Sequence, residues 1–300
     1  MPDPAATPSR DGALRVGVVG AGPWALLVHA PMFALHAGTE LVAVWARRLD
    51  AAEAVAVPLG ATAHDSFERF LDEVDAVSFA VPPDVQAELA TRAAAAGKAL
   101  LLEKPVALGV DAAEALAEAV DRSGVPTQLL LTWRYRADVR SLLAEVAATS
   151  PIGGTGRFLA DSFLGGMFAT PWRLDRGPLF DLGPHVIDLL DAALGTVIGI
   201  RAHGDPRNWV GLLLDHEGGA SSEVSLSGHT PVDRTRAGVE VHTTTGVLAV
   251  DTADFDPADL TTVVDEFVAT AAGRPHPLDL ARGLHLQRLL GEAAGQLEWS

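Results

Sequence analysis

Several residue types are missing or scarce in this 300-residue chain. It has no cysteine, which excludes disulfides and thiolate chemistry. Basic residues number 22 against 39 acidic ones, so the formal net charge is −17. This balance argues against nucleic acid or an anionic membrane as a partner, because both require a basic surface. The negative net charge does not exclude a small anionic ligand that is held by a few arginines.

Long apolar runs are also missing, since no stretch approaches the ~20 apolar residues of a membrane span. Residues 1–12 are polar, contain proline and lack the apolar run of a signal peptide. We interpret them as a disordered tail and expect a cytoplasmic protein. The 48% of hydrophobic residues is ample for a large core, and the length suggests about two domains.

Short apolar segments alternate with helical patterns in the first half of the chain. We expect strands at 14–19, 41–45, 76–81, 99–102 and 128–131, and helices at 23–37, 50–57, 84–96 and 111–121. Strands that are apolar on both faces and alternate with helices indicate a parallel sheet covered on both sides, the doubly wound α/β arrangement. This Rossmann-type domain is expected to span residues 13–127.

The pattern changes in residues 128–300, which we expect to form a second, α+β domain. A helix near 138–148 leads into a glycine-rich stretch at 151–156, and another helix is expected at 184–194. Five segments between residues 197 and 250 show polar alternation and are separated by turns, which indicates a mostly antiparallel sheet. Helices near 257–271 and 278–297 close the chain.

The first strand runs into Gly20-Ala21-Gly22-Pro23-Trp24-Ala25, a form of the dinucleotide fingerprint with alanine in third place. Gly20 allows a tight turn, and Gly22 lets the backbone approach a pyrophosphate. Pro23 suits the first position of a helix whose free N–H groups face the phosphates. We assign this segment, Trp24 included, to a cofactor site. A structural glycine turn is the alternative interpretation.

The end of the second strand indicates which cofactor binds. NAD enzymes usually place an acid there for the ribose 2′-hydroxyl, but here Ala46 takes that position and Arg47 and Arg48 follow. Guanidinium groups bind a phosphate with paired hydrogen bonds, which favours NADP. The alternative is that both arginines are solvated or stack on adenine.

Lysine is nearly absent, yet Lys104 stands in the tripeptide Glu103-Lys104-Pro105 at the end of an apolar run. The only other lysine is Lys98. The charge of an amine can be tuned by its surroundings, unlike that of arginine, which favours a chemical role. A strand-end lysine in solvent is the alternative.

A second dense cluster consists of Asp181, His185 and Asp188. At this spacing the three side chains share a helix face, although Pro184 is expected to start or bend the helix after Asp181. A carboxylate near an imidazole favours a general acid or base near neutral pH. A structural pair or a metal site is the alternative, with Asp188 as the candidate for a third ligand; we expect no metal.

Together these motifs resemble the Gfo/Idh/MocA oxidoreductases, the family of glucose–fructose oxidoreductase and inositol dehydrogenase. The resemblance runs from Arg15 to the final helix and rests on three motifs: Gly20-Ala21-Gly22, Gly97-Lys98 leading into Glu103-Lys104-Pro105, and Asp181-x-Gly183-x-His185-x-x-Asp188. It implies a Rossmann domain followed by an open, mostly antiparallel sheet domain that often mediates oligomerisation. It also implies that the substrate sits between the two domains.

The resemblance further implies roles for single residues. Lys104 would touch the reacting oxygen and the nicotinamide ribose, His185 would exchange the proton, and Asp181 would assist it and bind a neighbouring hydroxyl. Glu103 would be mainly structural within the cofactor site. The other implied positions are Val81 and Pro82 beneath the nicotinamide, and Arg134, Trp172 and Arg173 at the substrate.

The expected function is an NADP-dependent oxidoreductase, with NAD as the alternative cofactor. It would move hydride between nicotinamide and a secondary alcohol or ketone of a sugar, cyclitol or related polyol. Two other classes stay open: a non-catalytic nucleotide-binding regulator or sensor, and a glycosidase-like enzyme that uses tightly bound NAD. A homodimer or homotetramer through residues 197–250 is expected, since a second subunit usually covers an open sheet face. Gln86 stands where relatives frequently have histidine, which is expected to alter the nicotinamide contacts.

Overall fold

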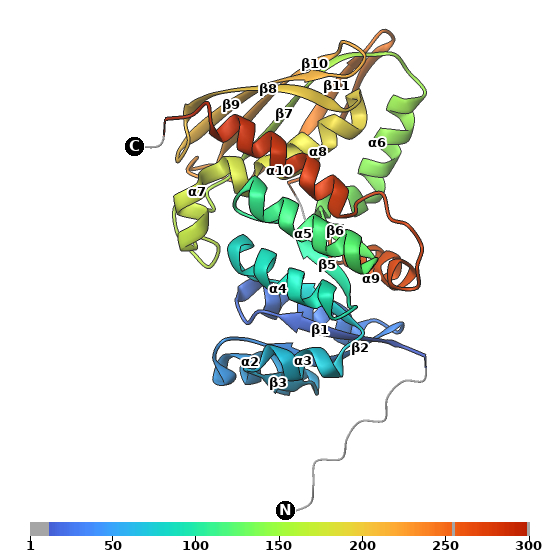
Figure 1. Cartoon of the computed structure of the whole chain (residues 1–300). Helices are drawn as coiled ribbons and strands as arrows, with labels where there is room; N and C mark the ends of the chain where they lie inside the picture. Colours follow the sequence, from blue (N-terminus) through green and yellow to red (C-terminus); the bar gives the residue numbers. More distant parts are fainter. Residues whose placement is uncertain (1–11, 254–255, 299–300) are drawn as a thin grey trace, which may run out of the picture. The chain divides into compact units, whose positions relative to one another are not determined.

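The computed structural model describes residues 12–253 and 256–298, so the predicted tail falls outside the described residues except at its last position. The chain forms two compact units (Figure 1). Unit 1 comprises the residues up to 107 together with 111–130 and 260–281. Unit 2 comprises 108–110, 131–259 and the residues from 282 onward. The domain boundary near residue 127 stays a prediction.

Unit 1 contains a six-stranded, fully parallel sheet in the order β3-β2-β1-β4-β5-β6. Its strands are β1 (Leu14–Val19), β2 (Thr39–Trp45), β3 (Thr62–His64), β4 (Ala76–Phe79), β5 (Ala99–Glu103) and β6 (Thr127–Leu130). This is the doubly wound order of dinucleotide-binding sheets, and the predicted Rossmann class is confirmed. The strand order reverses between β1 and β4, where ligands bind in such folds.

The helical elements of unit 1 lie between these strands, and one more comes from late in the chain. They are η1 (Ala25–His29), α1 (Ala30–Leu35), α2 (Leu49–Ala56), η2 (Val57–Leu59), α3 (Phe67–Glu73), α4 (Pro83–Ala95), α5 (Val110–Ser123) and α9 (Pro257–Ala271). The sequence pattern predicts neither β3 nor α3, because three and seven residues are too short for a periodic signal.

Helix α9 packs into unit 1 through buried contacts. The rings of Phe33 and Phe267 lie 6.0 Å apart. The buried amide of Gln128 donates to the Val263 carbonyl at 3.0 Å and accepts from the Thr270 hydroxyl at 3.2 Å. These bonds satisfy a polar side chain in the middle of β6, which explains why a segment from the end of the chain belongs to the first unit.

Unit 2 contains the second sheet, in the order β12-β11-β7-β10-β9-β8. Its strands are β7 (Pro151–Leu159), β8 (Val197–Asp205), β9 (Trp209–His216), β10 (Ser221–Ser227), β11 (Arg236–Thr243) and β12 (Gly246–Asp251). All pairings are antiparallel except β7 with β10, so the predicted mostly antiparallel sheet is confirmed. The other elements of the unit are η3 (Thr132–Tyr135), α6 (Ala137–Ala147), α7 (Pro171–Asp181), α8 (Gly183–Leu194) and α10 (Leu280–Ala294).

The glycine-rich stretch at 151–156 is a central strand, which the sequence pattern does not predict. It begins β7, between β10 and β11. A Cβ on Gly156 would lie 2.4 Å from Val186 of α8, and one on Gly154 would lie 3.1 Å from Leu194. The glycines therefore let α8 approach the sheet closely, a frequent reason for glycine inside a strand.

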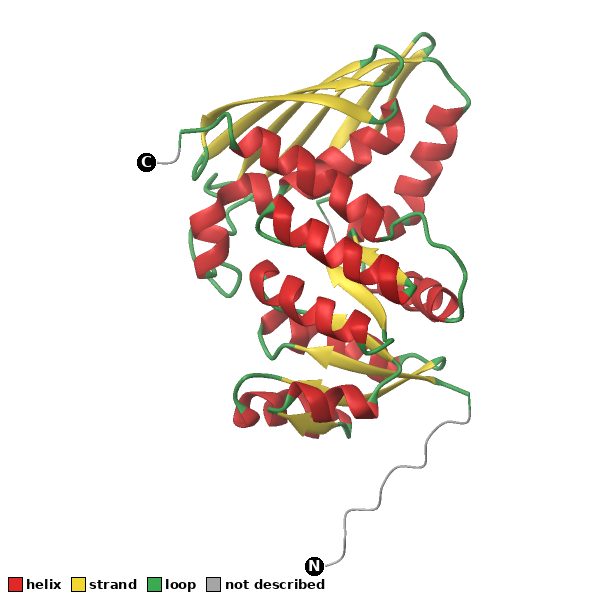
Figure 2. Ribbon diagram, in the orientation of Figure 1, coloured by secondary structure: helices red, strands yellow, loops and turns green. Residues whose placement is uncertain are grey.

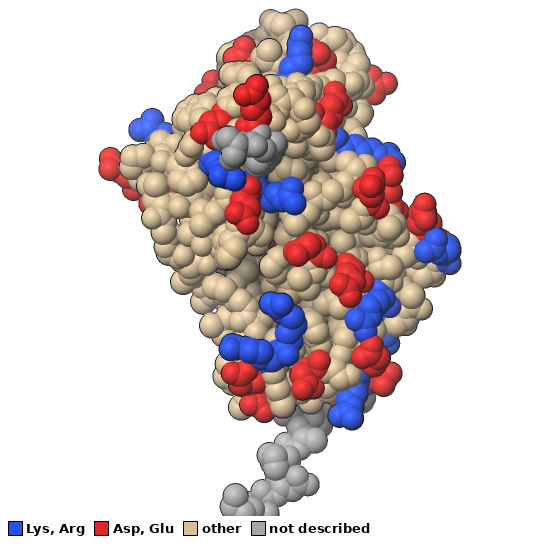
Figure 3. All heavy atoms as spheres, turned by 60° about the vertical axis from the view of Figure 1, so that its left-hand side comes forward, with Lys and Arg blue, Asp and Glu red and all other residues tan. Residues whose placement is uncertain are grey.

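The helices of unit 2 lie on one side of its sheet, and in the described part of the chain no helix covers the other side (Figure 2). Acidic and basic side chains are interspersed on the face drawn in Figure 3, without an extended basic area. Within the described ranges, no helix has the length and apolar character needed to cross a membrane.

Candidate functional site

The predicted cofactor residues of unit 1 share one edge of its sheet. Gly20 follows β1, Ala46 follows β2, Val81 follows β4, and Lys104 follows β5. Because these four neighbouring strands are parallel, their carboxyl ends lie at the same edge. In open α/β sheets this edge is where ligands bind.

The glycine loop leaves room for a phosphate group. Gly20 has φ +125°, and a Cβ there would lie 2.4 Å from the Ala80 carbonyl oxygen, so only glycine fits without a shift. A Cβ on Gly22 would meet nothing within 4 Å, so the backbone is open to a ligand at that point. Helical structure begins at Pro23, whose position leaves the following N–H groups directed toward the loop. These features fit a dinucleotide pyrophosphate.

The end of β2 lies against this loop, since the Gly20 N–H donates to the Trp45 carbonyl at 2.8 Å. Ala46 is buried, whereas Arg47 and Arg48 are exposed. The Arg48 guanidinium is 3.6 Å from Asp50, but both side chains are about three-quarters exposed, at 76% and 74%. A pair this open is weak, so it would not prevent Arg48 from binding a ligand phosphate.

Buried hydrogen bonds hold the turn that carries Lys104. Gln86 on α4 is fully buried, and its amide donates to the carbonyls of Glu103, Pro105 and Val106 at 2.7, 3.3 and 3.3 Å. Its side-chain oxygen accepts the Glu103 N–H at 2.8 Å. The Lys104–Pro105 peptide is cis. Gln86 therefore holds the backbone of the lysine turn. The sequence had predicted only that glutamine in place of histidine would alter the nicotinamide contacts.

Sequence reasoning missed a second set of contacts to the same turn. The Glu103 Oε1 atom accepts the Trp24 indole N–H at 2.6 Å and lies 3.1 Å from His29 Nε2. Its Oε2 atom accepts the Lys104 N–H at 3.1 Å. His29 is fully buried, and its Nδ1 lies 2.7 Å from the Ser78 hydroxyl. The sequence feature that could have revealed these contacts is a histidine, His29, within a mostly apolar helical segment from Ala25 to Leu35.

In unit 2 the predicted cluster falls at the junction of α7 and α8. Asp181 ends α7 and His185 lies in the first turn of α8, with Pro184 at the helix start as the sequence indicated. Gly177 interrupts α7 with φ +66°, and a Cβ there would lie 1.9 Å from the Pro206 carbonyl. This glycine permits the chain to turn just before Asp181.

Aromatic and charged side chains surround this junction. The buried His185 ring lies 5.3 Å from the Trp133 ring and 6.1 Å from that of Phe158. Asp181 forms an ion pair with Arg173, whose Nε lies 3.1 Å from Asp181 Oδ2. The Arg173 guanidinium also lies over the Trp172 ring, 4.8 Å from its centre. Of the predicted substrate residues, Arg173 therefore contacts Asp181, and Trp172 contacts Arg173.

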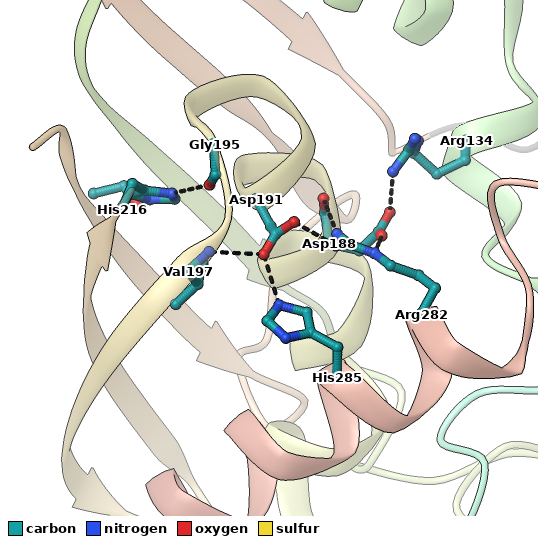
Figure 4. Close-up of polar contacts among 9 residues, drawn as sticks. Arg134, Asp188, Asp191, Gly195, Val197, His216, Arg282 and His285 are labelled. Atoms are coloured by element: carbon teal, nitrogen blue, oxygen red, sulfur yellow. Dashed lines mark hydrogen bonds and ion pairs between the residues drawn. The ribbon is translucent and has the colours of Figure 1, made fainter. Parts of the chain in front are cut away.

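Asp188 is almost fully buried, and two arginines pair with it (Figure 4). Arg134 donates to its Oδ2 at 3.0 Å, and Arg282 of α10 donates to its Oδ1 at 2.6 Å. With both oxygens used by guanidinium groups, the geometry favours a structural ion pair over a metal ligand. It also shows that Arg134, which was predicted to contact the substrate, is bound to α8 through Asp188.

Asp191 extends this network by one helical turn. Burial by itself would raise its pKa, but the hydrogen bond from His285 at 2.8 Å and the charge of Arg282 outweigh burial, and the pKa is lowered. Burial also disfavours the charged form of Arg282 and by itself would lower its pKa. The neighbouring charges of Asp188 and Asp191 outweigh burial, so the pKa of Arg282 is raised. Asp191 also accepts the Val197 N–H at 2.8 Å, which joins α8 to β8 (Figure 4).

Residues 14–130 match the family described as "Oxidoreductase family, NAD-binding Rossmann fold", GFO_IDH_MocA. Residues 14–130 are thus a Gfo/Idh/MocA-type NAD-binding domain. The resemblance seen in the motifs is thereby confirmed. Among curated proteins, the dTDP-3,4-didehydro-2,6-dideoxy-alpha-D-glucose 3-reductase of Streptomyces violaceoruber is 31% identical over 206 residues, which cover 63% of this chain and 57% of that protein. The match thus spans little more than half the length of this relative.

Solved structures extend the likeness over the whole chain. GenD2 from gentamicin A biosynthesis, in complex with NAD, has a TM-score of 0.84 at 22% identity and covers 99% of this chain and 97% of that chain. A mutant of KijD10, a 3-ketoreductase from Actinomadura kijaniata in complex with TDP-benzene and NADP, has a TM-score of 0.75 at 18% identity and covers 95% and 98%. At these identities the likeness shows the fold. The family description of residues 14–130, an NAD-binding Rossmann fold, supports a nicotinamide cofactor without a preference for NADP.

The buried network of unit 2 should depend strongly on Arg282. We expect Arg282→Met to lower the free energy of unfolding by about 3–5 kcal/mol at pH 7, since it leaves two buried carboxylates short of a partner. Because the folded-state pKa of Asp191 is lowered, its contribution is complete above the ordinary aspartate pKa and is lost as the pH falls through the lowered value. The difference between the two proteins should therefore shrink toward pH 3. Urea denaturation across this pH range measures it.

Arg122→Met is the control, because it breaks an exposed arginine–glutamate pair with Glu118 on α5, outside the buried network. Exposed pairs contribute about 0–1 kcal/mol, so its effect should stay within that range. Equal losses in the two variants would contradict the importance given to the buried network.

Proposed function

We propose that this chain is an NADP-dependent oxidoreductase of a secondary alcohol or ketone on a sugar, cyclitol or related polyol. The observation that carries the proposal is the construction of the Lys104 turn. In a unit of an NAD-binding family, buried side chains hold this turn at the ligand-binding edge of the sheet. The 3-reductase from Streptomyces, whose name specifies a nucleotide-linked sugar, supports a sugar as the substrate class.

The bound cofactor supplies or accepts the hydride, and the side chains manage the oxygen and its proton. The Lys104 amine stabilises charge on the reacting oxygen, which is electrostatic catalysis. His185 takes the proton from the alcohol or returns it to the alkoxide, as a general base or acid. Asp181 binds a neighbouring hydroxyl and assists His185, while Arg173 holds the Asp181 carboxylate in place. Trp172 and Arg134 belong to the same proposed substrate site.

Replacing Lys104 and His185 tests this chemistry. Lys104→Met and His185→Asn should each lower turnover by about 100- to 10,000-fold, the usual range for acid–base groups. NADPH affinity should change far less, and the pH dependence of the rate should lose one titration in the His185 variant. The assay follows NADPH and NADH absorbance over aldoses, inositols, ketosugars and simple diols.

Two matched controls accompany these variants. Lys98→Met removes the other lysine, which donates to the Val74 carbonyl at 2.8 Å, and His36→Asn changes a histidine of unit 1 that pairs with the exposed Asp265. Both should keep turnover within about twofold of the parent protein, because neither residue belongs to the proposed site. Near-normal turnover in Lys104→Met and His185→Asn would contradict the proposed roles.

The preference for NADP is part of the proposal and rests on the exposed pair after Ala46. Replacing Arg47 and Arg48 together with serine should weaken NADPH binding by about tenfold or more, because a hydrogen bond to a charged group contributes about 1.5–3 kcal/mol. NADH binding should change little, and Arg122→Ser on α5 serves as the control. Calorimetry that finds equal or tighter NADH binding by the parent protein would refute the preference.

Assembly through residues 197–250 also stays a proposal. The uncovered side of the second sheet combines apolar side chains that are partly exposed, Trp209, Leu213 and Val247, with the cross-strand pair of Arg201 and Asp215. A second copy could bury the apolar groups, and we expect a dimer or tetramer. Light scattering at micromolar concentration measures the mass, and a monomer would contradict this expectation.

A further inference from the structure

The helix that follows the glycine loop contains one π turn, which changes the direction of its side chains. The N–H of Ala30 donates to the carbonyl of Ala25, five residues earlier. In an α-helix, at about 100° per residue, Trp24 and His29 would point about 140° apart. Here both side chains reach the same oxygen of Glu103, and their rings lie 6.3 Å apart. Single π turns often occur at functional sites.

The Glu103 carboxylate joins this helix to the lysine turn. It is 13% exposed and receives three contacts, from Trp24, from His29 and from the Lys104 N–H. With His29 Nε2–H donating to Glu103, the Ser78 hydroxyl donates to Nδ1, so a neutral imidazole satisfies both contacts. Removing any donor would leave a largely buried carboxylate less satisfied, which favours a different position of the turn.

We propose that His29 and Trp24 are positioning residues that act on Lys104 through Glu103. The first turns of the helix that begins at Pro23 and the Lys104 turn then change position together. Placement of a phosphate at the helix N-terminus is thereby linked to placement of the lysine amine. This inference deepens the proposed function, on which the role of Lys104 rests. It goes beyond the assignment of Glu103 as a structural residue, because it makes Glu103 the connection between two parts of the site.

The lysine content of the chain allows a test that needs neither substrate nor cofactor. Lys104 and Lys98 are the two lysines, and both are half-buried. Brief acetylation with acetic anhydride, followed by peptide mass spectrometry, gives the reactivity of Lys104 relative to Lys98 within one molecule. Lys98, which donates to Val74, is the internal reference for folding.

We expect His29→Leu, Trp24→Phe and Glu103→Gln each to raise the Lys104/Lys98 ratio by about threefold or more, which corresponds to the loss of one hydrogen bond. His29→Gln, whose amide can still donate to Glu103, should return the ratio to within about twofold of the parent value. His36→Leu removes another histidine–carboxylate pair of unit 1, with Asp265, and should leave the ratio unchanged. Unchanged ratios in His29→Leu and Trp24→Phe, with Lys98 labelling as in the parent, would overturn the inference.

NADPH binding provides the second readout. If His29 acts through Glu103, the double variant His29→Leu/Glu103→Gln should bind NADPH about as tightly as Glu103→Gln alone. Additive losses would mean that His29 acts by another route and would also overturn the inference. A parent protein that binds neither NADPH nor NADH would contradict the proposed function, while the labelling ratios would still decide whether His29 and Trp24 position Lys104.

Discussion

Carboxylates removed from water need donors, and this requirement organises both units of the protein. Glu103, Asp181, Asp188 and Asp191 are all largely buried, and each is met by specific N–H groups. An ionised carboxylate without such partners would be strongly unfavourable in the interior. Each carboxylate therefore fixes the segment that carries it, and these segments hold the residues proposed for chemistry.

The two units solve this problem with different partners. In unit 1 Glu103 uses an indole, an imidazole and a backbone amide, none of which needs a permanent charge. In unit 2 the helix α8 places Asp188 and Asp191 where Arg282 contacts both. Guanidinium groups are suited to such buried pairs because they stay charged and offer several donors in one plane. The first arrangement suits a turn beside the proposed nucleotide site, and the second suits a helix that must stay in place on its sheet.

Close backbone approach is the second constraint, and glycine satisfies it at several positions, two of which lie beside the proposed site. Gly20 passes against the Ala80 carbonyl at the switch point of the parallel sheet, and Gly177 passes against the Pro206 carbonyl before Asp181. At both positions a side chain would collide with a backbone oxygen, which cannot move aside as a flexible side chain can. The positions of the glycine loop after β1 and of the α7–α8 junction therefore depend on the absence of a single Cβ at each.

The amino-acid sequence by itself determined the parallel sheet, the mostly antiparallel sheet and the resemblance to the Gfo/Idh/MocA oxidoreductases. Apolar periodicity and short motifs are local signals, so Gly20-Ala21-Gly22 and Glu103-Lys104-Pro105 were readable without coordinates. Tertiary structure alone decided that 151–156 is a central strand and that Gln86 holds the lysine turn. It also decided that Trp24 and His29 meet at Glu103. These outcomes depend on which groups approach one another across 17 to 92 residues of sequence, and on one π turn that alters the helical period. No pattern within a short window contains that information.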